Sequence, residues 1–120
     1  MLDHVSIGVR DTAVSKPFYD AALKPLGYSC LSQSPGSLGY GAQAAAFWVN
    51  DAARPVPADE KSGLHFCFAA PTRSSVDAFH AGALREGGGP VMRVAIVSRS
   101  FRNVSHRKLF VLGGRSANHL

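Results

Sequence analysis

Hydrophobic and polar residues alternate at the start of the chain. Over residues 2–9, the apolar residues Val5, Ile7 and Val9 alternate with His4, Ser6 and Gly8. A period of two is typical of a β-strand whose two faces differ in character. The pattern therefore predicts a strand that packs its apolar face against a core.

A helical pattern follows this strand. Asp11 is a favourable residue for capping a helix N-terminus. Apolar side chains then recur at helical spacing, at Val14, Phe18, Ala21 and Ala22. Pro17 fits poorly inside a helix, so either the first turn is kinked there or the regular helix begins near Ser15. Pro25 and Gly27 are expected to end it.

Three short strands are predicted after this helix, at residues 28–31, 38–41 and 45–50, with a turn at 34–36. Their connections are too short for crossovers, which favours antiparallel pairing. Residues 51–62 contain two prolines and many polar side chains, and are expected to form a linker.

The strand–helix pattern begins again at Gly63. A shift of 61 positions pairs five identical residues without a gap: His4 with His65, Phe18 with Phe79, Ala22 with Ala83, Leu23 with Leu84, and Gly27 with Gly88. Such pairing indicates an internal repeat. We therefore predict one α+β domain over residues 1–120, with module one at 1–50, the linker at 51–62 and module two at 63–120. The sheet is expected to be mixed, with one helix per module on a single face.

Composition fits a globular domain, because 46% of the 120 residues are hydrophobic and 18% are charged. No apolar run reaches the roughly 18 residues of a membrane helix. The first residues also lack the layout of a secretory signal. Cys30 and Cys67 are too few for a disulfide scaffold, so we expect buried free thiols and a cytoplasmic location.

Charge is distributed unevenly along the chain. Residues 1–86 hold seven Lys and Arg and all eight Asp and Glu, whereas residues 87–120 hold six Lys and Arg and no acid. A basic tail can attract nucleic acid or a membrane surface. We expect neither partner, because the tail has only two aromatic residues, Phe101 and Phe110, and no known binding motif.

Four segments carry a family resemblance. LDHVSIGVRD at residues 2–11 and FYDAAL at 18–23 resemble the opening of glyoxalase/bleomycin-resistance/dioxygenase proteins, the vicinal oxygen chelate superfamily. GLHF at 63–66 and VDAFH at 76–80 resemble the start of the second module of that superfamily. The resemblance implies two βαβββ modules that form a curved mixed sheet around a shared cavity.

The resemblance also implies a metal site. Metal-using members take His or Gln from the first strand of each module, and Glu from the last strand of one or both modules. His4 and His65 fall at the first-strand positions, and imidazoles suit Zn²⁺, Fe²⁺, Ni²⁺ or Mn²⁺. The last strand of module one has no acid at 47–50. We therefore expect either one of these ions or no cofactor.

The tail departs from the family pattern. Residues 90–109 match nothing in it, and the sequence ends at 118–120, where the strand that carries the Glu is expected to begin. We hypothesise a shifted reading frame or a truncation, and expect the second module to be atypical.

The expected pocket lies on the sheet face away from the helices, because that face carries small or polar side chains. His4 and Ser6 share this face in module one, as His65 and Cys67 do in module two. The aromatic residues Trp48 and Tyr40 could stack on a planar ligand there, although aromatic side chains in strands more often belong to a core.

Two functions follow from these expectations. The first is a metal-dependent lyase, isomerase or dioxygenase that acts on a small molecule with vicinal oxygens, which the two histidines favour. The second is a metal-free protein that binds a small planar or cationic compound, as bleomycin-resistance proteins do, which the missing carboxylates favour. An inactive paralogue is a third possibility. A homodimer is expected, because an open curved sheet leaves an edge to cover.

Overall fold

A computed structural model describes the backbone of residues 1–55, 65–86, 96–101 and 104–112, and the side chains of residues 1–55, 66 and 68–86. The elements follow in the order β1 (Val5–Val9), α1 (Thr12–Leu23), the 3₁₀ turn η1 (Lys24–Leu26), β2 (Ser29–Ser34), β3 (Ser37–Gly41), β4 (Phe47–Asp51), β5 (His65–Ala70), α2 (Arg73–Arg85), β6 (Ile96–Phe101) and β7 (Val104–Leu112). The predicted α+β class is confirmed. Neither helix in these residues has the length and apolar content needed to cross a bilayer.

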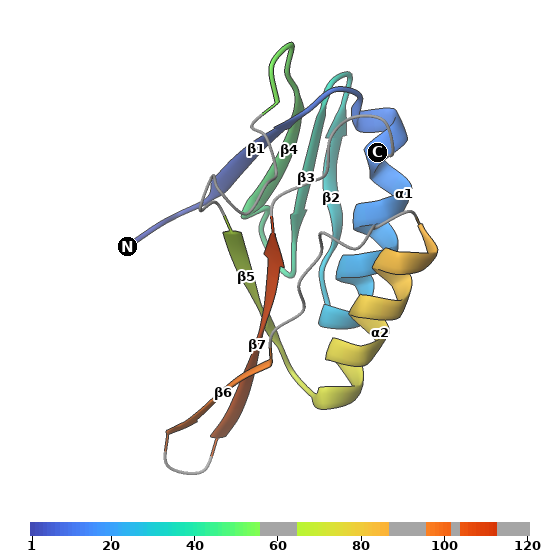
Figure 1. Ribbon diagram of the computed structural model, residues 1–120. Coiled ribbons are helices and arrows are strands. Elements are labelled where there is room, and N and C mark those ends of the chain that lie inside the picture. Colours follow the sequence, from blue (N-terminus) through green and yellow to red (C-terminus); the bar gives the residue numbers. More distant parts are fainter. Residues whose placement is uncertain (56–64, 87–95, 102–103, 113–120) are drawn as a thin grey trace.

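The first half forms a mixed four-stranded sheet in the order β1-β4-β3-β2 (Figure 1). β1 runs parallel to β4, whereas β3 pairs antiparallel with both β4 and β2. β2 and β3 form a hairpin, closed at Pro35 and Gly36, where Gly36 adopts a positive φ of 74°. The three strands and the turn expected after the first helix are therefore all present.

Two carboxylates cap the N-terminus of α1. The backbone N–H of Ala13 donates to Asp11 Oδ1 at 2.8 Å, and that of Thr12 donates to Asp51 Oδ1 at 2.8 Å. These acceptors satisfy donors that have no partner within the helix. The helix therefore begins at Thr12 with Pro17 inside it, and the alternative start near Ser15 is wrong.

The second half repeats the strand and the helix but not the sheet. β5 precedes α2, whose N-cap Thr72 forms a capping box with Ser75 and corresponds to Asp11 at the shift of 61 positions. The strands pair in the order β5-β7-β6, and both pairings are antiparallel. In the first half, by contrast, the strand before the helix pairs in parallel. The second module is thus atypical, as expected.

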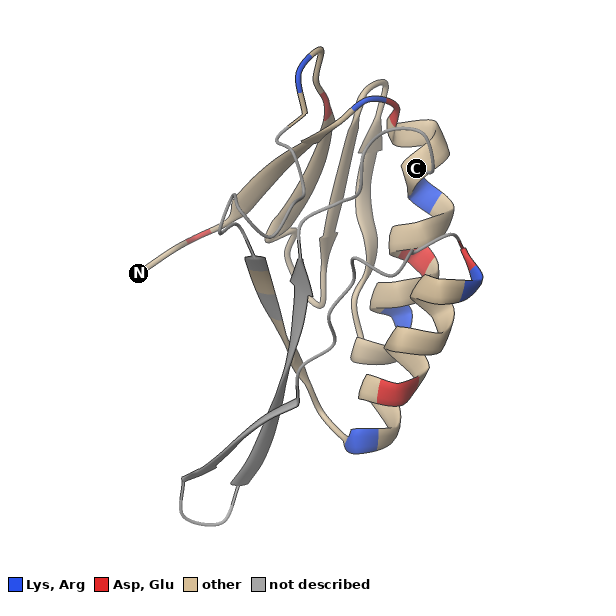
Figure 2. Ribbon diagram, viewed as in Figure 1, with Lys and Arg blue, Asp and Glu red and all other residues tan. Residues whose placement is uncertain are grey.

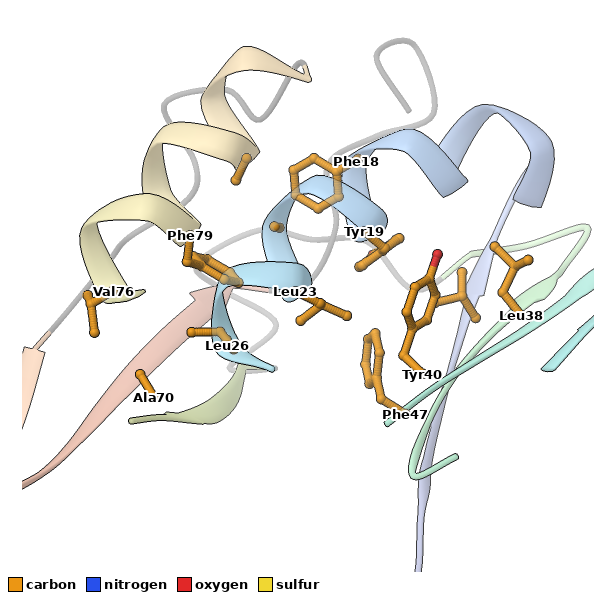
Figure 3. Packing of buried hydrophobic residues seen from close by; sticks show 13 residues of the cluster. Phe18, Tyr19, Leu23, Leu26, Leu38, Tyr40, Phe47, Ala70, Val76 and Phe79 are labelled. Atoms are coloured by element: carbon orange, nitrogen blue, oxygen red, sulfur yellow. The ribbon is translucent and has the colours of Figure 1, made fainter. Parts of the chain in front are cut away.

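One apolar cluster joins the two halves (Figure 3). Phe18 of α1 and its repeat counterpart Phe79 of α2 are both buried. The ring centroids of Phe47 and Phe68 lie 5.1 Å apart, and those of Phe68 and Phe79 lie 6.4 Å apart. This chain of aromatic contacts runs from β4 through β5 to α2, so β5 and α2 share their core with the first sheet.

The two helices lie side by side on one side of the four-stranded sheet (Figure 1). Both helices contain acidic and basic residues (Figure 2). The helix layer therefore covers the apolar face of the first sheet. Neither α1 nor α2 lies on the other face, here called the outer face.

Candidate functional site

The outer face of β4 carries an aromatic ring and an amide. Phe47 and Val49 are 8% and 0% exposed and belong to the core beneath the helices. Because side chains alternate along a strand, Trp48 and Asn50 lie on the opposite face. Both keep part of their surface exposed.

Neighbouring strands extend this row of polar groups. Ser6 of β1 and Gly39 of β3 are the register partners of Trp48, and paired residues share a face of the sheet. The Ser37 hydroxyl donates to Asn50 Oδ1 at 2.6 Å. The outer face thus presents an indole beside uncharged hydrogen-bonding groups, which suits a planar compound with polar edges.

Parts of the chain itself fill some of the space above this face. A Cβ atom placed on Gly39 would lie 2.8 Å from Cη2 and Cζ3 of Trp48, so the indole packs directly on the backbone there. A Cβ on Gly41 would lie 1.8 Å from the carbonyl oxygen of Ala44. At Gly39 and Gly41 the space above the sheet is therefore occupied by the chain itself and is not open to a ligand.

His4 lies immediately before β1, two residues before Ser6. Its side chain is 54% exposed, and its Nδ1 atom lies 2.9 Å from Asp3 Oδ1. When Nδ1 carries the proton and donates to Asp3, the lone pair of Nε2 is free to accept a proton or a metal ion. His65 begins β5, but its side chain and that of Cys67 lie outside the described residues.

The described residues do not complete a metal site around His4. Asp51 follows Asn50 at the end of β4, but its carboxylate accepts the Thr12 N–H at the start of α1. The side chains of β4 on the outer face include no carboxylate. Within the described residues, no three His, Cys, Asp or Glu side chains cluster closely enough to hold an ion.

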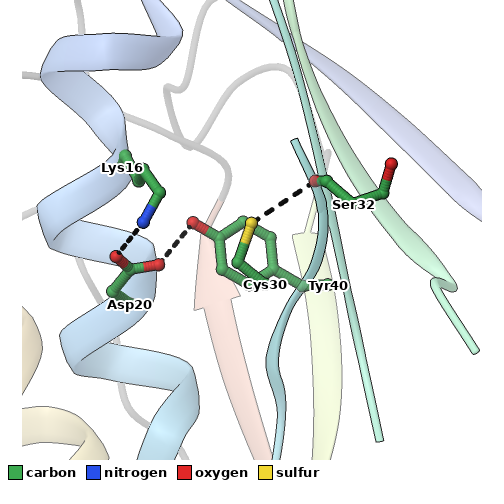
Figure 4. A network of polar contacts seen from close by, with 5 residues as sticks. All are labelled: Lys16, Asp20, Cys30, Ser32 and Tyr40. Carbon is green, nitrogen blue, oxygen red and sulfur yellow. Dashed lines mark hydrogen bonds and ion pairs between the residues drawn. The ribbon is translucent and has the colours of Figure 1, made fainter. Parts of the chain in front are cut away.

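Tyr40 does not lie on the outer face. Its side chain is 1% exposed beneath α1, and its hydroxyl donates to Asp20 Oδ1 at 2.9 Å (Figure 4). Lys16 Nζ lies 2.6 Å from the other carboxylate oxygen of Asp20. Burial and the hydrogen bond to Asp20 raise the pKa of Tyr40, so the phenol stays protonated. Tyr40 therefore links the sheet to α1 and does not stack on a ligand with Trp48.

An open groove of about 530 Å³ lies on the helix side of the sheet. It runs between the first turns of α1 and the β2–β3 hairpin, and Lys16, Gln33 and Leu38 are among its lining residues. Lys16 is already paired with Asp20, so it offers no free charge to a ligand. The groove is separate from the face that carries Trp48 and Ser6.

Comparison with known proteins finds a relative of known structure. No protein-family profile matches the chain, and no curated protein matches it. A glyoxalase/bleomycin resistance protein from Albidiferax ferrireducens T118 is similar to it, with a TM-score of 0.62 and 27% sequence identity. The match covers 93% of this chain and 97% of that one.

The resemblance to the vicinal oxygen chelate superfamily is confirmed. The outer face of the first sheet, with Ser6 and Trp48, is therefore part of a glyoxalase-like fold. Asn50 also lies on this face, and sequence reasoning missed it as a candidate. The alternation of apolar and polar residues over positions 47–50 could have identified it, since Asn50 is two residues from Trp48.

Proposed function

We propose that the protein binds a small planar organic compound on the outer face of the first sheet, with the compound stacked on Trp48. The observation that carries the proposal is the row across β1 and β4, where Trp48 is flanked by the hydroxyl of Ser6 and the amide of Asn50. An indole is the best aromatic partner for a planar cation, and hydroxyl and amide groups can orient its polar edge.

The side chains on the outer face favour ligand binding over catalysis of a reaction. β4 offers an indole and an amide on its outer side, and its one carboxylate caps α1. The relative of known structure bears the name glyoxalase/bleomycin resistance protein, which covers both an enzyme and a drug-binding protein. Among the described residues, the side chains on the outer face favour the drug-binding protein.

Trp48→Ala tests the proposal directly. With metal-free bleomycin and 1-methylquinolinium as probes, we expect the wild-type protein to bind at least one, and the variant to bind it on the order of tenfold more weakly. The loss reflects removal of the stacking surface. Isothermal titration calorimetry measures both dissociation constants.

Val14→Ala is the matched control, because Val14 is 55% exposed on α1, which lies across the sheet from Trp48. We expect this variant to bind like the wild type. Equal affinities of wild type and Trp48→Ala would contradict the proposal, as would a wild type that binds neither probe.

A metal-dependent activity is the second candidate, and one observation favours it. In many metal sites a carboxylate accepts a hydrogen bond from one nitrogen of an imidazole and so orients the other nitrogen toward the metal, and the contact between Asp3 and Nδ1 of His4 resembles this arrangement. The test is the metal content of protein purified without chelators. About one equivalent of metal in the wild type, lost in His4→Ala, would support this candidate, whereas a metal-free wild type would count against it.

A further inference from the structure

The position of the Trp48 ring depends on Gly39, which has no side chain. Cη2 and Cζ3 belong to the six-membered ring of the indole, at the end of the side chain farthest from the backbone. Both atoms lie 2.8 Å from the place where a Cβ on Gly39 would be. Contacts between side-chain carbons are normally 3.5 Å or longer, so any side chain at position 39 excludes the ring from its place.

The loop between β3 and β4 closes the space on another side. The same Cβ would lie 3.0 Å from Cβ of Ala45. The loop is held to β3 and β1, because Ala46 N–H donates to the carbonyl oxygen of Tyr40 and Val5 N–H donates to the carbonyl oxygen of Ala46. The indole is attached only through its own side-chain torsions, so it is the group that moves when position 39 is filled.

We propose that Gly39 is a positioning residue for the planar ligand. Because Gly39 has no side chain, the Trp48 ring packs directly on the backbone of the sheet, and this contact fixes the height above the sheet at which a compound can stack. The inference rests on the proposed function. A larger residue at 39 raises the ring away from the sheet, into the space that a stacked compound would occupy. Gly39 thereby limits how the site accepts planar compounds without touching them.

Gly39→Ala tests this inference through the fluorescence of Trp48, which is the only tryptophan of the chain. We expect the emission of the variant to shift to longer wavelength, and quenching by acrylamide to increase, because the displaced ring meets more water. In calorimetric titrations with the probe that the wild type binds, bleomycin or 1-methylquinolinium, we expect affinity to fall on the order of tenfold.

Trp48→Phe provides the control background. A phenylalanine ring lacks the distal part of the indole that contacts Gly39, so in this background Gly39→Ala should change affinity by less than about twofold. The coupling between the two positions distinguishes displacement of the ring from a general effect on the sheet. Midpoints of urea unfolding confirm that each variant is folded.

Three results would each overturn the inference: an unchanged emission spectrum in Gly39→Ala, an unchanged affinity in Gly39→Ala, or an affinity loss of the same size in the wild-type and Trp48→Phe backgrounds. Failure of the proposed function gives a different result, since either the wild type would bind neither probe or Trp48→Ala would bind the probe as tightly as the wild type.

Discussion

Leu23→Ala is expected to lower the free energy of unfolding by about 2–5 kcal/mol, whereas Leu84→Ala lowers it by less than about 1 kcal/mol. The two leucines are repeat counterparts on α1 and α2. Leu23 is 1% exposed, at the centre of the shared cluster, whereas Leu84 is 47% exposed. Truncation of Leu23 removes buried methyl groups and leaves a cavity. Truncation of Leu84 removes groups that water already reaches.

Urea unfolding followed by circular dichroism measures both values, and the pair controls for residue type and for position along the helix. Equal losses would show that the two helices bury equivalent faces, as a symmetric duplication requires. A larger loss of unfolding free energy for Leu23→Ala than for Leu84→Ala would instead mean that α2 is rotated or covered differently from α1. Leu23 then belongs to the core of the whole domain, and Leu84 to its surface.

Much of the fold could be predicted from local pattern. The alternation before Asp11, the cap itself and the helical spacing after it specify β1 and α1, because each depends only on neighbours in the chain. The same reasoning located α2, since Thr72 has the capping role of Asp11. The repeat therefore described the strand–helix part of each half correctly.

The sheet of the second half could not be predicted in the same way. Pairing of β5 with β7 is a contact between residues about 40 positions apart, and the identities that reveal the repeat stop at Gly88, before β7 begins. Burial also differs between counterparts, as Leu23 and Leu84 show. A shift that aligns residue types indicates shared local structure, but which face is covered depends on what packs against it.

In the candidate site too, the sequence pattern did not show which side chains other parts of the chain cover. Ser6 and Trp48 were predicted as neighbours of a pocket, and they are register partners on the outer face. Tyr40 was included because it is aromatic, yet strand β3 turns it toward α1, where Asp20 accepts its hydroxyl. Gly39 carries no chemistry that a motif could reveal, and its role depends on the close approach of Trp48.

Gly82→Ala is expected to destabilise the protein by about 1–2 kcal/mol, although alanine favours a helix over glycine by about 1 kcal/mol. Gly82 lies in α2 where that helix crosses α1. A Cβ at this position would lie 2.7 Å from the carbonyl oxygen of Ala21 and 3.2 Å from its carbonyl carbon. Because these atoms belong to the backbone of α1, no side-chain rotation relieves the clash, and the helices must separate.

Ala81→Gly is the matched control, since residue 81 is the exposed neighbour of Gly82 on the same helix. This change should cost about 0.5–1 kcal/mol through helix propensity alone. Gly82→Val, which adds two more methyl groups at the crossing, should cost about 3 kcal/mol. A gain in stability from Gly82→Ala, measured by urea unfolding, would mean that the helices are not in contact there. The aromatic chain from Phe47 to Phe79 would then be the main link between the two halves.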